Sequence, residues 1–224
     1  MINAFKYNDC GNSLKGYLIG LLIGLICNAI CVLMSYLMGD IKLSFYGFDF
    51  RALMTLFIAI FIQSGAEELV DRYYIYQKLR RAYNSPLVAI IANSLIFMSM
   101  HILNPGFTFI SAVQLMLFFI TASLFVYYYN GLWIAIGMHM AWNFCQSIIF
   151  GLPNSGIVSV YSIFKLEAAS ARNGFFYNVN FGVEASYGAC LILLILLIGL
   201  CYLNKNKGEK NDIWKIEDSS STIN

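Results

Sequence analysis

The chain has 224 residues, of which 59% are hydrophobic and only 12% are charged, and its formal net charge is +2. A soluble domain of this length carries about 25% charged residues, so the composition excludes an ordinary soluble protein and indicates a membrane protein. The small net charge gives no indication of nucleic-acid binding, and we expect the lipid bilayer, not a nucleic acid, as a partner.

The chain contains six apolar runs that are long enough to be membrane helices, since a helix needs about 20 apolar residues to cross a bilayer. Asparagine with proline or glycine marks several of the breaks between these runs, and such residues favour turns. We therefore predict an all-α, polytopic membrane bundle that forms one domain over residues 1–224, with a polar C-terminal tail over 205–224. The predicted helices cover residues 14–38, 50–81, 86–103, 107–129, 131–151 and 187–203.

Six crossings would place both chain ends on the same side of the membrane. In that topology ten of the 14 lysine and arginine residues lie on the side of the chain ends, if Arg72 is counted there. The positive-inside rule then predicts a multi-pass protein of the cell membrane with cytoplasmic termini. The ten are Lys6, Lys15, Arg72, Lys78, Arg80, Arg81, Lys205, Lys207, Lys210 and Lys215.

Residues 152–186 form a long connection that is aromatic and apolar, with few charges. Irregular backbone can lie at membrane depth only where protein or a water-filled cavity surrounds it, so a lid or a re-entrant segment fits this composition. A plain extracytoplasmic loop fits it equally well.

The ionisable residues within the predicted helices are the main functional signal. Glu67 and Glu68 directly follow the apolar stretch TLFIAIFIQ, and the two histidines of the chain, His101 and His139, also lie in apolar runs. A charged side chain near the centre of a membrane costs about 2.5–3.5 kcal/mol on insertion scales, so these residues need a functional or structural reason.

Helix geometry places these groups at similar depth. Measured from the turn at residues 84–86, Glu67 lies about 21 Å along the incoming helix and His101 about 22 Å along the returning helix. His139 lies about 12 Å into its own helix, also well inside the membrane. We therefore predict one buried polar centre shared by three helices.

The spacing of polar residues suggests how they pair. Glu68 and Arg72 are four residues apart and are expected to form an ion pair within the helix, which leaves Glu67 on an adjacent face. His139 and Asn143 share one helix face in the same way. Phe97 shares a face with His101 and could shield its imidazole. Interfacial anchoring by the ion pair, and interhelical hydrogen bonds that only hold helices together, are the structural alternatives.

Three short motifs resemble those of a known family of membrane proteases. EELVDR at 67–72 has the form EExxxR, FMSMH at 97–101 has the form FxxxH, and HMAWN at 139–143 has the form HxxxN. In this order they resemble the CPBP family, the CAAX-processing and bacteriocin-processing intramembrane proteases, also called the Abi family. The resemblance extends over residues 60–185, which we expect to be the catalytic core. Asp71 departs from the pattern, because many members have an aromatic residue before the arginine.

The resemblance implies hydrolysis of a peptide bond in a membrane-associated peptide or protein. Glu67 would be the general base that activates a water, and His101 would help to position that water. His139 and Asn143 would stabilise the oxyanion that develops on the scissile carbonyl. Glu68 and Arg72 would orient the first of these helices.

The family has been described both as metalloproteases and as metal-independent glutamate proteases. We favour the metal-independent form, in which no cofactor is required, because the sequence lacks an HExxH motif. If zinc is present, Glu67, His101 and His139 would be its ligands.

The sequence therefore predicts an intramembrane endopeptidase, with processing of leader peptides, bacteriocins or signalling peptides, or bacteriocin immunity, as its biological setting. The alternative is a non-catalytic membrane protein that keeps the fold for peptide binding or immunity. A proton-coupled transporter would also use intramembrane glutamate and histidine, but it is expected to show inverted repeats, and none is apparent in the sequence.

Overall fold

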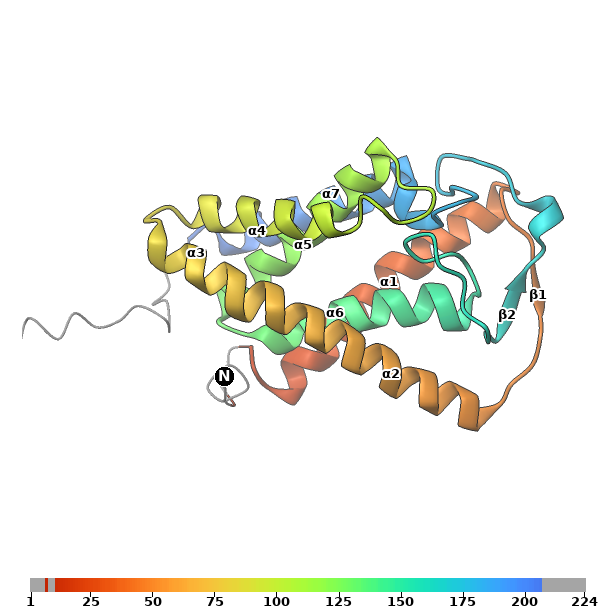
Figure 1. Cartoon of the computed structure of the whole chain (residues 1–224), viewed down its shortest axis with the longest axis horizontal. Helices are drawn as coiled ribbons and strands as arrows, with labels where there is room; N and C mark the ends of the chain where they lie inside the picture. The colour runs from red at the N-terminus through yellow and green to blue at the C-terminus, as the bar shows by residue number, and fades with distance from the viewer. Residues whose placement is uncertain (1–6, 8–10, 207–224) are drawn as a thin grey trace, which may run out of the picture.

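The computed structural model describes Tyr7 and residues 11–206 of the chain. Most of these residues are helical, and the predicted helices are present with ends that differ by a few residues (Figure 1). The predicted C-terminal tail lies outside the described residues from position 207 onward. The helices are α1 (Leu14–Leu37), α2 (Phe50–Glu68), α3 (Tyr76–Ala82), α4 (Pro86–Met100), α5 (Phe109–Tyr129), α6 (Leu132–Phe144) and α7 (Tyr187–Asn204).

Two of the predicted helices contain π-helical turns. Leu69–Ile75 is π-helical and joins α2 to α3 in one continuous helical rod, and Cys145–Ile149 extends α6 in the same way. In the first of these segments the backbone N–H of Tyr76 bonds the carbonyl oxygen of Asp71, five residues earlier. A π-helical turn is rare and occurs mostly near functional sites, so these two interruptions direct attention to the residues beside them.

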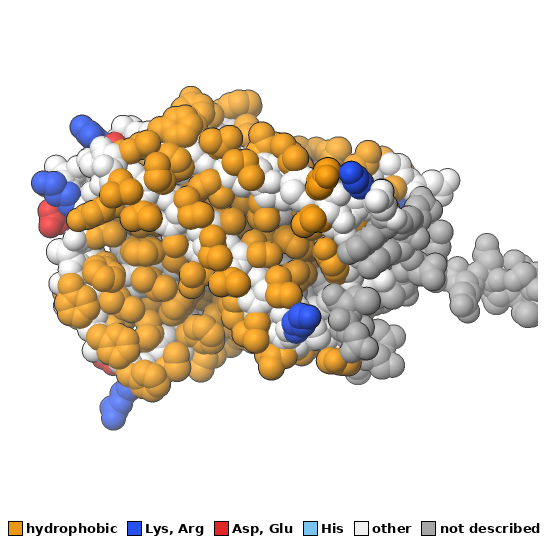
Figure 2. Space-filling view, turned by 180° about the vertical axis from the view of Figure 1, so that it is seen from behind, with side chains coloured by type: hydrophobic (Ala, Val, Ile, Leu, Met, Phe, Trp, Pro, Cys, Tyr) orange, Lys and Arg blue, Asp and Glu red, His pale blue; other side chains and the backbone are white. Residues whose placement is uncertain are grey.

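Four helical segments of the described chain are long and apolar enough to cross a membrane. They are Leu14–Leu37, Phe50–Ala82, Phe109–Tyr129 and Tyr187–Asn204, whereas α4 is apolar but has only 15 residues. The expectation of a mostly helical, multi-pass membrane bundle is confirmed, and the number of six crossings stays a prediction. Figure 2 shows that hydrophobic side chains cover most of one face of the molecule, as expected for a surface in contact with lipid.

Two short strands that were not predicted accompany the helices. β1 (Leu43–Phe45) pairs antiparallel with β2 (Phe164–Leu166), with Leu43 opposite Leu166. The pairing arises because the segment after α6 folds back onto the connection between α1 and α2, where the rings of Phe45 and Phe164 meet edge to face at 5.9 Å. A contact between segments so far apart in sequence leaves no local pattern.

The start of α1 and the end of α7 lie at the same end of the bundle (Figure 1). Asn12, just before α1, accepts a hydrogen bond of 2.7 Å from the backbone N–H of Leu132 at the start of α6. The side chain of Asn204 donates to the Tyr129 hydroxyl at the end of α5, at 3.3 Å. We call this the terminal end. The opposite end carries residues 38–49, 101–108 and 150–186, and we call it the loop end.

Helix α6 is the centre of the bundle. Every residue from Ile134 to Asn143 is buried, which is typical of a helix that other helices surround. Its closest neighbour is α1, and glycine makes this approach possible: a Cβ atom added at Gly24 would clash with the backbone carbonyl of Met138. Gly20 of α1 and Gly137 of α6 meet the partner backbone equally closely. Small residues at such interfaces allow membrane helices to pack backbone to backbone.

We predict that Gly24→Ala destabilises the protein, because the added methyl group forces α1 away from α6. Overpacking of this kind lowers the free energy of unfolding by about 1–3 kcal/mol. Gly199→Ala in α7 is the matched control, since no atom lies within 4 Å of a Cβ placed there. Unfolding in detergent micelles would measure both variants, and equal stability of Gly24→Ala and the wild type would contradict the proposed packing.

Candidate active site

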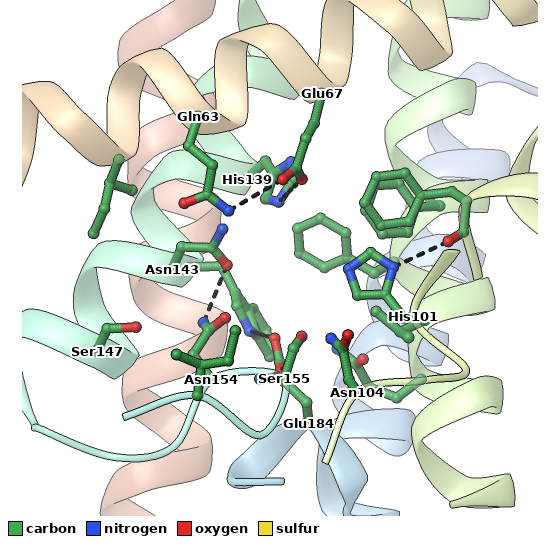
Figure 3. A pocket seen from close by; sticks show the side chains of 18 of the residues that line it. Gln63, Glu67, His101, Asn104, His139, Asn143, Ser147, Asn154, Ser155 and Glu184 are labelled. Carbon is green, nitrogen blue, oxygen red and sulfur yellow. Dashed lines mark hydrogen bonds and ion pairs between the residues drawn. The ribbon is translucent and has the colours of Figure 1, made fainter. Parts of the chain in front are cut away.

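The predicted site residues come from the rod that begins with α2, from the end of α4 with Phe97 and His101, and from α6. Glu67 and Glu68 are the last two residues of α2, and Arg72 lies in the π-helical segment that follows. His139 and Asn143 lie on α6. All of the predicted catalytic side chains line one cavity of about 360 Å³, which Figure 3 shows from close by. The four are Glu67, His101, His139 and Asn143.

A fully buried ion pair lies behind the cavity. The Arg72 Nη1 and Glu68 Oε1 atoms are 3.0 Å apart, and neither side chain is exposed to solvent. Arg72 also donates through Nη2 to the backbone carbonyl of Phe119, at 3.3 Å, and its guanidinium lies 4.2 Å from the centre of the Phe119 ring. The structure thus contains the ion pair expected from the spacing of Glu68 and Arg72, and places it deep in the protein and away from any interface with water.

The same glutamate holds the histidine of α6. The Nδ1 atom of His139 lies 3.0 Å from Glu68 Oε1, so one carboxylate oxygen serves both Arg72 and His139. The rings of Phe118 and Phe119 pack edge-on against the imidazole, with centroids 5.7 and 5.6 Å away. Hydrogen bonding and aromatic packing together fix the orientation of His139.

Glu67 faces the cavity. Its side chain keeps 30% of its surface exposed, whereas that of Glu68 is fully buried. One oxygen accepts a hydrogen bond from Gln63 Nε2 at 3.1 Å, and the other lies 3.6 Å from His139 Nε2. Adjacent glutamates of the sequence therefore have different surroundings: Glu68 is locked in the protein, and Glu67 is accessible from the cavity.

His101 does not lie inside α4, as the sequence had suggested, but follows its last residue, Met100. The helix stops early because the chain turns at Asn104-Pro105-Gly106, where Gly106 has a positive φ of 78°. The imidazole stacks on Phe97 at 4.6 Å, and its Nδ1 hydrogen-bonds the Phe97 carbonyl at 3.0 Å. Because a carbonyl only accepts, Nδ1 must donate, and in the neutral ring Nε2 is then an acceptor. Figure 3 shows this ring facing the cavity.

Asn143 meets a residue from the long segment after α6. Its Oδ1 accepts a hydrogen bond of 3.1 Å from Asn154 Nδ2. Part of the 152–186 segment therefore forms a wall of the cavity, and its depth in the membrane stays a prediction. The segment adds Asn154, Ser155, Ile157, Ser159 and Glu184 to the lining.

Several polar lining residues were not predicted. Gln63 lies one turn before Glu67, Asn104 follows His101, and Ser147 lies one turn after Asn143. Gln63 shares a helix face with Glu67, and Ser147 shares one with Asn143, so their spacing could have identified them. The loop residues Asn154 and Glu184 reach the site only through tertiary folding.

Asp71 is buried with 1% of its surface exposed, and its Oδ1 has no hydrogen-bond partner among the described residues. The hydrogen bonds of Arg72 go to Glu68 and Phe119, so Asp71 does not take the arginine from its glutamate. Nothing in the structure explains the aspartate at this position.

The three candidate zinc ligands do not form a ligand set in this arrangement. Both ring nitrogens of His139 face glutamates, and Nδ1 of His101 is engaged by Phe97. Within the described part of the chain, no three His, Cys, Asp or Glu side chains are grouped so that they could hold a metal ion. The metal-independent mechanism stays a prediction.

Comparison with known proteins agrees with the motifs. Residues 49–145 match the family model described as type II CAAX prenyl endopeptidase Rce1-like, a range that contains EExxxR, FxxxH and HxxxN. The match confirms the predicted resemblance to the CPBP and CAAX protease family, and it supports endopeptidase activity of the CAAX type. The extension of the catalytic core to residue 185 stays a prediction. No match was found among curated proteins or among solved structures.

We predict that Arg72→Met strongly destabilises the protein, because it leaves the Glu68 carboxylate buried without its cation. Breaking a buried pair in this way costs about 3–5 kcal/mol. Arg172→Met is the comparison: this arginine pairs with the buried Asp40 at 3.2 Å, but its own side chain is 65% exposed. Because water screens the exposed guanidinium, its loss should cost less than that of Arg72. Similar unfolding free energies for the two variants would contradict a structural role for the buried pair.

Proposed function

We propose that this protein is an intramembrane endopeptidase in which Glu67 activates a water molecule without the help of a metal. The observation that carries the proposal is the contrast between the two glutamates: one is neutralised and buried, and the other faces a polar cavity. In that cavity Glu67 lies near an imidazole of α6 and opposite the ring of His101. A carboxylate placed in this way is suited to general-base catalysis.

In the proposed reaction Glu67 takes a proton from water, and the water oxygen attacks the carbonyl carbon of the scissile peptide bond. The Nε2 atom of His101 accepts a hydrogen bond from the O–H group that stays on that water and thereby orients it. When the carbon–nitrogen bond breaks, the proton held by Glu67 passes to the leaving amine. The products are a new carboxyl group and a new amino group, and the glutamate returns to its starting form.

The negative charge that develops on the carbonyl oxygen would be stabilised from α6. The amide nitrogen of Asn143 is a donor whose partner oxygen is already bound to Asn154. His139 would donate from Nε2 in its doubly protonated form, with its Nδ1 proton held by Glu68. Donors arranged before the reaction are worth about 2.7–4 kcal/mol each.

The substrate class we propose is a peptide or protein segment associated with the membrane. The matched family description names a CAAX prenyl endopeptidase, and in a CAAX sequence the cysteine four residues from the C-terminus carries the lipid. Leader peptides, bacteriocins and signalling peptides, or a role in bacteriocin immunity, remain within the same proposal, because each brings an extended peptide to a lipid surface.

We predict that Glu67→Gln lowers the cleavage rate by about 10²–10⁴-fold, the usual contribution of a general base. Asn143→Ala should lower it by about 10²–10³-fold, as expected for one oxyanion donor. The assay uses the purified protein in liposomes with a quenched farnesylated CAAX peptide and with a library of membrane-associated peptides, analysed by mass spectrometry. Glu167→Gln, which changes an exposed carboxylate at the loop end, should leave the rate unchanged.

Three results of this assay would contradict parts of the proposal. Full activity of Glu67→Gln would show that the base is another group. Loss of activity with a chelator, restored by zinc, would show that a metal takes part. Binding of peptides without cleavage by the wild type would favour the non-catalytic alternative.

We also propose that the termini lie in the cytoplasm. Of the nine described lysine and arginine residues other than Arg72, five lie at the terminal end and four at the loop end. The five are Lys15, Lys78, Arg80, Arg81 and Lys205. The sequence adds Lys6, Lys207, Lys210 and Lys215 close to the chain ends, and the positive-inside rule assigns the side with the excess to the cytoplasm. A fluorescent protein fused after Asn224 should be fluorescent in the membrane, and alkaline phosphatase fused there should be inactive. The reverse pattern would overturn the orientation.

A further inference from the structure

A turn over residues 153–157 lies against α6 beside the cavity. Its two backbone hydrogen bonds join Asn154 and Ile157, each at 2.9 Å. Ser155 has a left-handed φ of 47°, an unusual conformation for a residue other than glycine. The side chain of Gln146, one turn beyond Asn143, donates to the carbonyl of Pro153, and its backbone carbonyl accepts from Leu152. The turn is therefore held in one position relative to α6.

Glu184 ties this turn to α6 from the other side. The residue is 4% exposed, and one carboxylate oxygen accepts hydrogen bonds from the backbone N–H of Ser155 at 2.6 Å and from the Ser155 hydroxyl at 3.0 Å. The other oxygen accepts from Trp142 Nε1 at 3.1 Å. Charge-assisted hydrogen bonds of this kind are short and strong, so the carboxylate acts as a bridge between the helix and the turn.

The bridge joins Ser155 of the turn to Trp142 of α6. Asn154 directly precedes Ser155 and Asn143 directly follows Trp142, so the bridge brings the two asparagines together. Asn154 then donates to the Oδ1 of Asn143. An asparagine amide can rotate by half a turn and exchange its donor and acceptor ends. A donor held against Oδ1 prevents that exchange, and Figure 3 shows the Asn143 nitrogen directed toward the part of the cavity near Gln63 and His139.

We propose that Asn154 is a positioning residue that keeps the Asn143 amide nitrogen directed at the substrate, and that Glu184 holds Asn154 in place. The inference rests on the proposed function, in which Asn143 stabilises the oxyanion. Neither Asn154 nor Glu184 takes part in the bond-making steps, and both act through the orientation of one amide.

The test uses Asn154→Asp and Asn154→Ala in the liposome assay, with the peptide that the wild type cleaves best. A carboxylate only accepts, so Asn154→Asp should draw the Asn143 nitrogen toward itself and turn the Asn143 oxygen to the substrate. We expect kcat to fall by about 10²-fold, similar to the loss of the oxyanion donor, with little change in KM. Asn154→Ala removes the restraint without reversing it, and its kcat should lie between those of Asn154→Asp and the wild type.

A double-mutant cycle separates positioning from a loss of folding. In an Asn143→Ala background there is no amide left to orient, so Asn154→Asp should cause no further loss of kcat. Glu184→Gln should lower kcat, as Asn154→Ala does. This variant is informative only if its thermal unfolding midpoint equals that of the wild type. Asn180→Ala, an exposed asparagine of the same 152–186 segment, is the matched control and should behave like the wild type.

The outcomes distinguish this inference from the function on which it rests. If Glu67→Gln and Asn143→Ala are inactive while Asn154→Asp keeps the wild-type kcat, the inference is overturned and the proposed function stands. Equal losses from Asn154→Asp in both backgrounds would also overturn it. If neither Glu67→Gln nor Asn143→Ala affects cleavage, or nothing is cleaved, the proposed function fails and the inference falls with it.

Discussion

The carboxylate of Glu68 has no access to water, and one of its oxygens receives both the Arg72 guanidinium and the His139 imidazole at 3.0 Å. Taking such charges out of water is costly, and the short contacts between opposite charges offset that cost only in part, because Glu68 Oε2 and Arg72 Nε have no hydrogen-bond partner among the described residues. The interaction therefore fixes two elements at once. It ties the end of α2 and the π-helical turn to α6, and it sets the plane of the histidine that faces Glu67.

The remainder of the fold protects this arrangement from the bilayer. Helix α6 is buried along almost its whole length, so its polar residues face other protein and not lipid. The segment after α6 packs onto the bundle through buried residues such as Leu152, Tyr177 and Phe181. That segment closes one wall of the cavity with side chains that can hydrogen-bond.

The helices and most of the candidate catalytic residues could be predicted from the sequence, because membrane helices are long apolar runs and an ionisable residue within one is conspicuous. The end of α4 was placed too late, since the apolar pattern continues past His101 while the turn at Pro105 already bends the backbone. Depth arguments placed Glu67 opposite His101, but they could not show that its nearest imidazole is that of His139. Asn154 and Glu184 lie in a segment without periodicity, and their partners on α6 are set by tertiary packing alone.

The π-helical segment Leu69–Ile75 determines which insertions and deletions the chain can tolerate. Each turn of a π-helix holds one more residue than a hydrogen-bonded turn of an α-helix. Loss of a single codon here would let the rod close into a regular α-helix with α3 at nearly its present rotation, whereas loss of one codon from α2 would rotate everything beyond by about 100°. Glu67 and Glu68 lie just before this segment and Arg72 lies within it, so a loss between them would place the arginine three residues after Glu68, still on the same helix face. An insertion or deletion in the exposed turn at residues 83–85 would not disturb that register, although both sites lie on the same helical hairpin.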